Sequence, residues 1–580
     1  MHRSSLRIGI DIGGTFTDFV VFDQSSGDFQ AFKALSTPKA PEEAVLDGLS
    51  QVSSPIASMV HGSTVATNAL IERKGAHIAL ITTLGFRDIL TIGRQNRAQI
   101  YDFFADRPQP LVSDEDCLEI TERVNHEGQV LIPLAEEEIA PLIQTLRERN
   151  VESVAISLLF SFLHPEHEQR IASKLREAGL YVSSSCEILP EFREYERAST
   201  TAINAYVTPI MNSYIERLEL ICSKTNTGLR IMQSNGGSIS ASQARREAAR
   251  SILSGPAGGV VGALYTAETA GFSKVITFDM GGTSTDVSLS HGDIRVTSES
   301  EVGGLPLRIP VIDIHTVGAG GGSIAHIDSG GALRVGPESA GADPGPVCYG
   351  RGGSQPTVTD ANVTLGRLAP EYFLGGKMSL DVQAAVNSLA HLAKKAGLIA
   401  SPGLTPAQTA ALGVIQIANA HMQGALRVIS VERGFDPRDF SLESFGGAGG
   451  LHACELAREL GIQSVLIPRG ASTLSAFGML ATDIVKDYVQ TVMLPGDTNY
   501  NDLERSASLL AERGQRDVHA EGVPKSHIKL RSELDMRYQG QAYELSIPLT
   551  PRFLEDFHNH HEIAYGHSES SASVEIVNVR

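Results

Sequence analysis

Short apolar runs separated by glycine-rich turns recur along the chain, and one such pattern is duplicated. The stretch 6–22 reads LRIGIDIGGTFTDFVVF, and the stretch 275–289 reads VITFDMGGTSTDVSL. Their central segments, 11–18 and 279–286, agree at six of eight positions. Apolar runs on both sides of a Gly-Gly turn are typical of a β-hairpin. The pattern therefore predicts strand, turn and strand twice, once in each half of the chain.

Helical and strand periodicities alternate over the rest of the sequence. The segments with helical spacing are 135–149, 165–178, much of 196–270, 406–433, 451–460 and a polar stretch at 502–515. The short apolar segments that predict strands are 154–158, 528–530 and 543–547. This alternation predicts an α/β fold in which one domain type is duplicated. The expected units are 1–195, 196–490 and a small mixed α+β C-terminal region, 491–580.

The duplicated turn is suited to phosphate binding. Glycine has no Cβ, so a phosphate oxygen can approach backbone N–H groups closely. The candidate phosphate-binding residues are Gly13, Gly14, Thr15 and Thr17 in the first copy, and Gly281, Gly282, Thr283 and Ser284 in the second. Asp11 and Asp279 end the first strand of each hairpin, where a hydrated Mg²⁺ on those phosphates needs oxygen ligands. We assign catalytic roles to Asp11, Asp279, Thr15 and Thr283.

A structural explanation stands beside the functional one. Gly-containing hairpins are common in a chain with 56 glycines, but the matching contexts of the two copies disfavour coincidence. Asp18 and Asp286 are expected to hydrogen-bond N–H groups of their own turns.

Three further glycine-rich loops follow apolar strands, at 254–259 (SGPAGG), 315–323 (HTVGAGGGS) and 445–450 (FGGAGG). A loop that opens a helix presents free N–H groups to an anion or nucleotide, although close packing explains such glycines equally well. The second loop begins a G-x-G-x-x-A pattern. The turn-rich sequence that follows it, up to residue 346, does not fit the long helix of a dinucleotide-binding unit.

A polar stretch follows the apolar residues that end at Val60. The candidate substrate-binding residues are His61, Thr64, Thr67, Asn68 and, further on, Arg94. A helix cap at Ser63 or Thr64 and a solvated loop around Arg94 are the structural alternatives.

Asp313 and His315 alternate on one predicted strand and therefore share a face. They are candidates for a second metal site or an orienting pair, whereas a buried, hydrogen-bonded histidine is the favoured explanation.

Composition excludes several classes of protein. The chain has 580 residues with 48 Lys plus Arg against 67 Asp plus Glu, a net charge of −19, which disfavours nucleic-acid binding. No apolar run approaches the length of a membrane span, and no signal peptide is readable, so we expect a cytoplasmic protein. The five cysteines are scattered and contain no CxxC, as expected of reduced thiols.

Many ordered motifs resemble those of the hydantoinase A and oxoprolinase family, within the larger group of sugar-kinase, heat-shock-chaperone and actin-like ATPases. They include GIDIGGTFTD (9–18), HGSTVATNALIERKG (61–75), SGPAGG (254–259), FDMGGTSTD (278–286), DIHTVGAGGGSIA (313–325), GADPGPVCYGRGG (341–353) and FGGAGGLHA (445–453). Family members usually continue past 574–578 into a β-rich segment, which leaves open whether the C-terminal region is complete.

The resemblance implies duplicated ATPase domains and ATP-dependent opening of a cyclic amide such as a hydantoin, 5-oxoproline or another lactam. Phosphorylation of the amide carbonyl oxygen would activate it for attack by water. The expected cofactors are ATP and Mg²⁺, and the expected partner is a B-type subunit in a homo- or hetero-oligomer. By family analogy the adenosine contacts Gly258, Gly259, Gly446, Gly447 and Gly449.

Three alternatives stay open at this point. Related proteins use ATP to carboxylate ketones such as acetone or acetophenone. An actin-like ATPase module would use ATP to change shape and bind a protein, and a small-molecule kinase would release a stable phosphorylated product.

Overall fold

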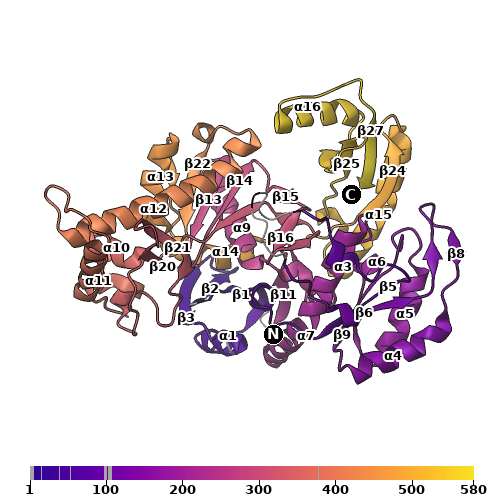
Figure 1. The fold of residues 1–580 in the computed structure, drawn as a ribbon, viewed down its shortest axis with the longest axis horizontal. Helices are drawn as coiled ribbons and strands as arrows, with labels where there is room; N and C mark the ends of the chain where they lie inside the picture. Colours follow the sequence, from indigo (N-terminus) through magenta and orange to yellow (C-terminus); the bar gives the residue numbers. More distant parts are fainter. Residues whose placement is uncertain are drawn as a thin grey trace.

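The computed structural model describes residues 6–14, 16–37, 40–52, 54–96, 101, 108–376 and 378–580 (Figure 1). Helices and strands alternate through most of the chain, and the larger sheets have six, five, four and four strands. The predicted α/β class is confirmed. No helix among the described residues combines the length and apolarity needed to cross a membrane.

The first hairpin belongs to the six-stranded sheet. Its strands, in sheet order, are β12 (Ser238–Ser240), β11 (Gly228–Met232), β4 (Ile56–Ser63), β1 (Leu6–Ile12), β2 (Phe16–Asp23) and β3 (Phe29–Leu35). β1 and β2 are antiparallel, and β4 runs parallel to β1. β11 and β12 complete this sheet from beyond residue 195, so the sheet spans the boundary expected at 195.

The second hairpin belongs to the five-stranded sheet, which repeats this arrangement. Its strands, in sheet order, are β19 (Ile314–Val317), β14 (Thr285–His291), β13 (Lys274–Met280), β22 (Ser441–Phe445) and β23 (Val465–Leu466). β13 is antiparallel to β14 and parallel to β22, as β1 is to β2 and β4. The strand directions confirm the predicted duplication.

Two smaller units flank the duplicated sheets on the right of Figure 1. One has the strand order β10 (Tyr181–Ser184), β9 (Ser153–Ser157), β5 (Ile78–Thr83), β6 (Cys117–Ile120), with helices α4 (Ile139–Glu148) and α5 (Glu166–Glu177). The other has the order β24 (Gln490–Pro495), β27 (Val574–Val579), β25 (Glu533–Tyr538), β26 (Leu545–Pro548), with helices α15 (Tyr500–Ala520) and α16 (Phe553–Tyr565). The predicted strand at 528–530 was wrong, since this strand begins at Glu533.

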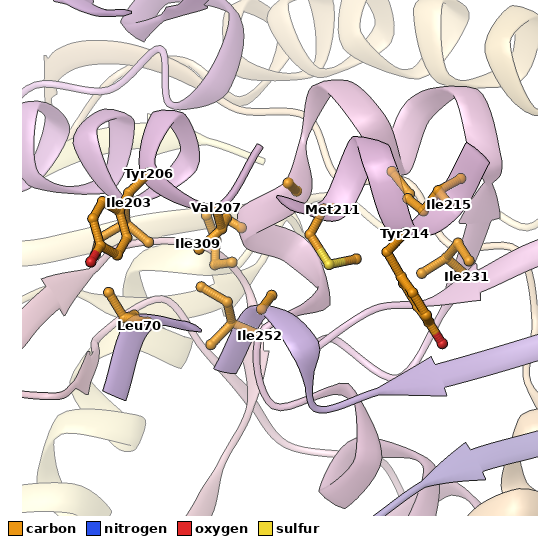
Figure 2. Close-up of a cluster of buried hydrophobic side chains, with 14 of the residues drawn as sticks. Leu70, Ile203, Tyr206, Val207, Met211, Tyr214, Ile215, Ile231, Ile252 and Ile309 are labelled. Carbon is orange, nitrogen blue, oxygen red and sulfur yellow. The ribbon is translucent and has the colours of Figure 1, made fainter. Parts of the chain in front are cut away.

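The helix α7 (Glu194–Thr225) forms the centre of the first core. Its apolar residues, including Ile203, Val207 and Met211, are buried against the sheet and the neighbouring segments (Figure 2). Ile252 and Ile309, from beyond residue 195, lie in the same cluster. Ile78, Leu80 and Ala155 of the four-stranded sheet belong to this cluster too. The four-stranded unit and the first hairpin unit therefore share part of one hydrophobic core.

The helices α9 (Ser254–Thr269) and α14 (Leu474–Ala481) cross at very short range. A Cβ added to Gly478 would lie 1.8 Å from the Gly258 carbonyl oxygen, and one added to Gly259 would lie 2.9 Å from the Phe445 ring. Both Gly258 and Gly259 are buried inside α9. The neighbours of these two glycines are thus α14 and β22, and their contact with adenosine stays a prediction.

Glu443 on β22 gives the fold a measurable pH dependence. Its side chain is buried, one carboxylate oxygen accepts a hydrogen bond from Thr266, and the other has no partner among the described residues. Burial raises its pKa from 4.5 to about 7, so the folded chain keeps a proton that the unfolded chain releases. The free energy of unfolding should fall by up to about 3 kcal/mol as pH rises from 4.5 through 7.

Glu443→Gln should remove this pH dependence, because glutamine does not titrate. The free energy of unfolding of the variant minus that of the native chain should therefore increase from pH 5 to pH 8. Urea unfolding at several pH values measures the effect. Glu177→Gln, at an exposed site on α5, serves as the control. An unchanged pH profile for Glu443→Gln would contradict the assignment.

Candidate phosphate-binding site between two hairpins

The two hairpin turns have the same hydrogen-bond geometry. The Gly13 N–H donates to the Phe16 carbonyl at 3.0 Å, and the Gly281 N–H donates to the Ser284 carbonyl at 3.0 Å. The turn tips are open, because no described atom lies within 4 Å of a Cβ placed on Gly14 or Gly282. Thr283 is exposed and Ser284 is half-buried, whereas Thr15 lies outside the described residues. The open tips leave room for a phosphate group.

Four aspartates occupy matching positions in the two hairpins. Asp11 is opposite Asp18 in the first, and Asp279 is opposite Asp286 in the second. Burial raises the pKa of Asp11 to about 7, with a further contribution from Asp18. Burial also raises the pKa of Asp279, and the charges of Asp286, Asp11 and Asp18 raise it further. The charges of the first hairpin's aspartates thus affect the pKa of Asp279 in the second hairpin.

This cluster fits a bound cation. Asp11 Oδ1 is buried and accepts no hydrogen bond from the described residues. Mg²⁺ prefers hard oxygen ligands and commonly takes one or two carboxylates while keeping several waters. No set of three or more His, Cys, Asp or Glu side chains forms a metal site in the described part of the chain. Asp11 and Asp279 could hold Mg²⁺ together with phosphate oxygens and water.

The other two aspartates have protein partners. Asp18 accepts a hydrogen bond from Lys33 Nζ at 2.6 Å, and Asp286 accepts one from the Thr316 hydroxyl at 2.5 Å. These partners are side chains of neighbouring strands, whereas the sequence analysis expected N–H groups of the turns. Both aspartates are nevertheless held by hydrogen bonds within the protein.

Lys33 was missed by the sequence analysis, and it connects the hairpin to a distant segment. Its ammonium also donates to the Ser472 carbonyl at 2.6 Å. The charge of Lys33 lowers the pKa of Asp11, Asp18 and Asp279 against the effect of burial. Nothing near Lys33 in the sequence signals this role, because its partner Asp18 is set by the strand register.

Two glycine loops support the second hairpin. The N–H groups of Gly321 and Gly322 donate to the carbonyls of Gly281 and Gly282 at 3.0 and 2.6 Å. This contact explains the glycines at 320–322, where added side chains would meet the hairpin backbone.

The loop 445–450 reaches the second aspartate. Gly446 has φ +78°, and a Cβ there would lie 2.3 Å from Asp279 Oδ1. Gly447 is exposed, whereas a Cβ on Gly449 would lie 2.7 Å from Ser444 Oγ in the buried interior. Gly446 and Gly447 therefore remain candidate nucleotide contacts, and Gly449 has a packing role instead of the predicted adenosine contact.

Two further predicted site residues have structural partners. Thr17 is fully buried, and its hydroxyl lies 3.1 Å from that of Ser36, so it is not available to a phosphate. Asp313 forms an ion pair with both terminal nitrogens of Arg433, at 2.5 and 2.9 Å. His315 lies half-buried on β19. Since Asp313 is already neutralised, the predicted second metal at Asp313 and His315 is corrected.

The predicted substrate residues separate into buried and exposed groups. His61 is fully buried, with Nε2 2.6 Å from the Tyr214 hydroxyl, and burial lowers its pKa to about 4. Thr67 accepts a hydrogen bond from the Leu253 N–H at 2.9 Å. His61 is thus enclosed by protein, whereas Thr67 is half-buried, and the role of both residues in substrate binding stays a prediction.

Thr64, Asn68 and Arg94 are, like Thr67, at least partly exposed. Thr64 and Asn68 hydrogen-bond each other at 3.3 Å at the start of α2 (Val65–Ile71). Arg94 donates two hydrogen bonds of 2.7 Å to Glu196, so its guanidinium is already paired. Thr64 and Asn68 remain candidates for binding substrate, whereas Arg94 would first have to exchange its partner.

Comparisons with known proteins agree along the whole chain. The family model described as hydantoinase/oxoprolinase matches residues 197–488, and that of the hydantoinase/oxoprolinase N-terminal region matches residues 7–179. The caprolactamase subunit alpha of Pseudomonas jessenii is 39% identical, over 100% of this chain and 87% of the relative. The 5-oxoprolinase 1 of Arabidopsis thaliana is 34% identical, over 93% of this chain and 46% of the relative.

Solved structures give the same result. The crystal structure of the ATP-dependent caprolactamase from Pseudomonas jessenii has a TM-score of 0.88 and 38% identity, over 99% of this chain and 86% of that one. A nucleotide-free acetone carboxylase structure has a TM-score of 0.76 and 27% identity, over 99% and 86% of the two chains. With two family models and relatives of this similarity, the chain belongs to the hydantoinase/oxoprolinase family.

Proposed function

We propose that this chain is the ATP-using subunit of a cyclic-amide hydrolase that acts with a B-type partner subunit. The observation that carries the proposal is the pair of matching hairpins with open glycine turns, whose aspartates are close enough to affect one another's pKa. The similarity to a caprolactamase subunit alpha and to 5-oxoprolinases supports a lactam as the substrate.

The chain's own residues would position the phosphates. The N–H groups of Gly14 and Gly282, at the open tips of the two turns, would bind phosphate oxygens from two sides, and Thr283 and Ser284 would add hydroxyl donors. Asp11 and Asp279 hold Mg²⁺, which supplies positive charge to the phosphates. Phosphoryl transfer depends mainly on such positioning and charge stabilisation.

The overall reaction balances as lactam, ATP and two waters giving an amino acid, ADP and phosphate. ATP supplies the phosphoryl group that makes the resonance-stabilised amide carbonyl more electrophilic. One water cleaves the ring C–N bond and leaves a carboxylate and an amine on one molecule. The second water accounts for release of the phosphate.

Purified chain with ATP, Mg²⁺ and hydantoin, 5-oxoproline or caprolactam, with and without a co-expressed B-type subunit, tests the proposal. We expect ring opening with one ADP released per ring. ADP release without ring opening on any of these lactams, even with the partner present, would contradict it.

A ketone carboxylase subunit is the second candidate. An acetophenone carboxylase gamma subunit from Aromatoleum aromaticum is 34% identical over 92% of this chain and 77% of the relative, and the acetone carboxylase structure has the same fold. Bicarbonate-dependent consumption of acetone or acetophenone, with no lactam cleavage, would favour this candidate over the hydrolase.

Lys33 provides a further test of the cleft. Lys33→Met should raise the KM for MgATP about tenfold, because it removes a charge-assisted hydrogen bond to Asp18 and the cation that offsets the aspartates. Steady-state kinetics and calorimetry measure the change. Lys74→Met, whose lysine is exposed and paired with Glu72, is the control. Equal KM values for Lys33→Met and the native chain would rule out this role.

A further inference from the structure

A polar groove lies on the outer side of the second sheet, away from the hairpins. It runs between α12 (Pro406–Ile429) and α13 (Ala453–Leu460) and encloses about 420 Å³. Successive side chains of a strand point to opposite faces of its sheet. On β22, Leu442 packs with residues of α12 and α13, whereas Glu443 accepts a hydrogen bond from Thr266 of α9, so α9 and the groove lie on opposite faces. The groove is therefore separated from α9 by the sheet. Its volume is in the range of small-molecule sites.

Both charge signs line this groove. Glu455 accepts hydrogen bonds of 2.7 Å from Arg367 and from the Asn419 amide, which fix its position. Arg458 and Glu459 are exposed and lie three and four residues after Glu455, about one helical turn further along α13, and neither side chain forms an ion pair or hydrogen bond with the described residues. A free guanidinium beside a free carboxylate is complementary to a ligand that carries both charges.

We propose that this groove binds a small zwitterionic amino acid, with its carboxylate on Arg458 and its ammonium on Glu459. Arginine binds carboxylates through two parallel hydrogen bonds, which gives the carboxylate end a defined geometry. The two opposite charges predict a zwitterionic ligand whatever the protein's function is. The identification of that ligand as a reaction product rests on the proposed function. Opening the ring of a lactam yields a molecule with an amine and a carboxylate, so the product of a lactam has the required chemistry.

The groove is connected to the nucleotide loop by hydrogen bonds. Asn419 Oδ1 lies 2.7 Å from Nδ1 of the buried His452, and the His452 N–H donates to the Gly449 carbonyl at 3.0 Å. The next link is the Ala448 N–H, which donates to the Met280 carbonyl at 3.0 Å, beside Asp279. These hydrogen bonds connect a residue that lines the groove to the second hairpin. We therefore assign the groove an effector role, in which a bound ligand changes the affinity of the hairpin site for nucleotide.

Equilibrium binding of 6-aminohexanoate and of glutamate to the full chain, without ATP or lactam, tests the site. Both zwitterions should bind, and hexanoate and hexylamine should bind at least tenfold more weakly because each carries one of the two charges. Arg458→Ala should weaken zwitterion binding about tenfold. Ala420→Trp, at an exposed position of the groove on α12, should abolish it by filling the space.

Arg505→Ala, at an exposed position on α15, is the matched control and should bind as the native chain does. Zwitterion binding that survives both groove variants, or no binding to the native chain, would overturn the site. The effector role predicts that 6-aminohexanoate changes the Kd for MgATP in the native chain and not in Arg458→Ala, since coupling between two sites is reciprocal. An unchanged Kd would overturn that role. Because no assay here needs ring opening, these outcomes are independent of the proposed activity.

Discussion

Asp279→Asn should lower ATP turnover at least about 10²-fold, the loss expected when one charged group is removed from a phosphoryl-transfer site. Asp279 is half-buried, and desolvation raises its pKa together with the charges of Asp286, Asp11 and Asp18. Carboxylates gathered in this way repel one another unless a cation is present. The substitution removes a proposed ligand for Mg²⁺ and also relieves this charge repulsion. Release of ADP, measured in a coupled assay, gives the rate, and thermal unfolding should show no loss of stability.

Asp286→Asn is the matched control for this prediction, because Asp286 lies opposite Asp279 in the same hairpin and is bonded to Thr316. We expect it to retain much more turnover, since it acts on the site only through position and charge. Equal losses in the two variants would show that Asp279 has no special role as a ligand.

Gly478→Ala should produce the largest loss of stability, about 3 kcal/mol or more, because a single methyl group must be inserted between two helices. The added Cβ would lie 1.8 Å from the Gly258 carbonyl oxygen and 2.7 Å from the Gly262 nitrogen, which are backbone atoms of α9. Neither can move without shifting the helix. Thermal unfolding and limited proteolysis would report the change.

Gly424→Ala is the control for the glycine effect. Gly424 is exposed in α12, and no described atom lies within 4 Å of a Cβ placed there. Alanine should therefore stabilise the helix by about 0.5–1 kcal/mol. If Gly478→Ala were as stable as Gly424→Ala, the close approach of α9 and α14 would be wrong.

Local sequence was sufficient to predict both hairpins. The strand-turn-strand pattern at Asp11 and at Asp279 depends on neighbouring residues alone, and the structure gives the two copies the same register. The helices around 139–148, 166–177 and 406–429 were likewise readable from their periodicity. The expected substrate class and the expected partner came from the resemblance to a family, because a pattern of apolar residues carries no information about either.

Long-range packing decided which of the predicted site residues are available to a ligand. Gly258 and Gly259 look like a nucleotide loop in the sequence, but α14, more than two hundred residues later, packs against them. His61 precedes a polar stretch, yet Tyr214 of α7 closes over it. Lys33 carries no motif and became visible only when the strand register placed it beside Asp18.

The sequence by itself determined the two glycine turns, the aspartates at their bases and the alternation of helix and strand, because these follow from the conformational preferences of adjacent residues. The tertiary structure alone decided that the charges of the two turns' carboxylates affect one another, that Lys33 offsets them, and that Arg458 in the groove between α12 and α13 has no partner in the described part of the chain. Electrostatic interaction and burial depend on distances in space, and those distances are fixed only when segments remote in the chain pack together.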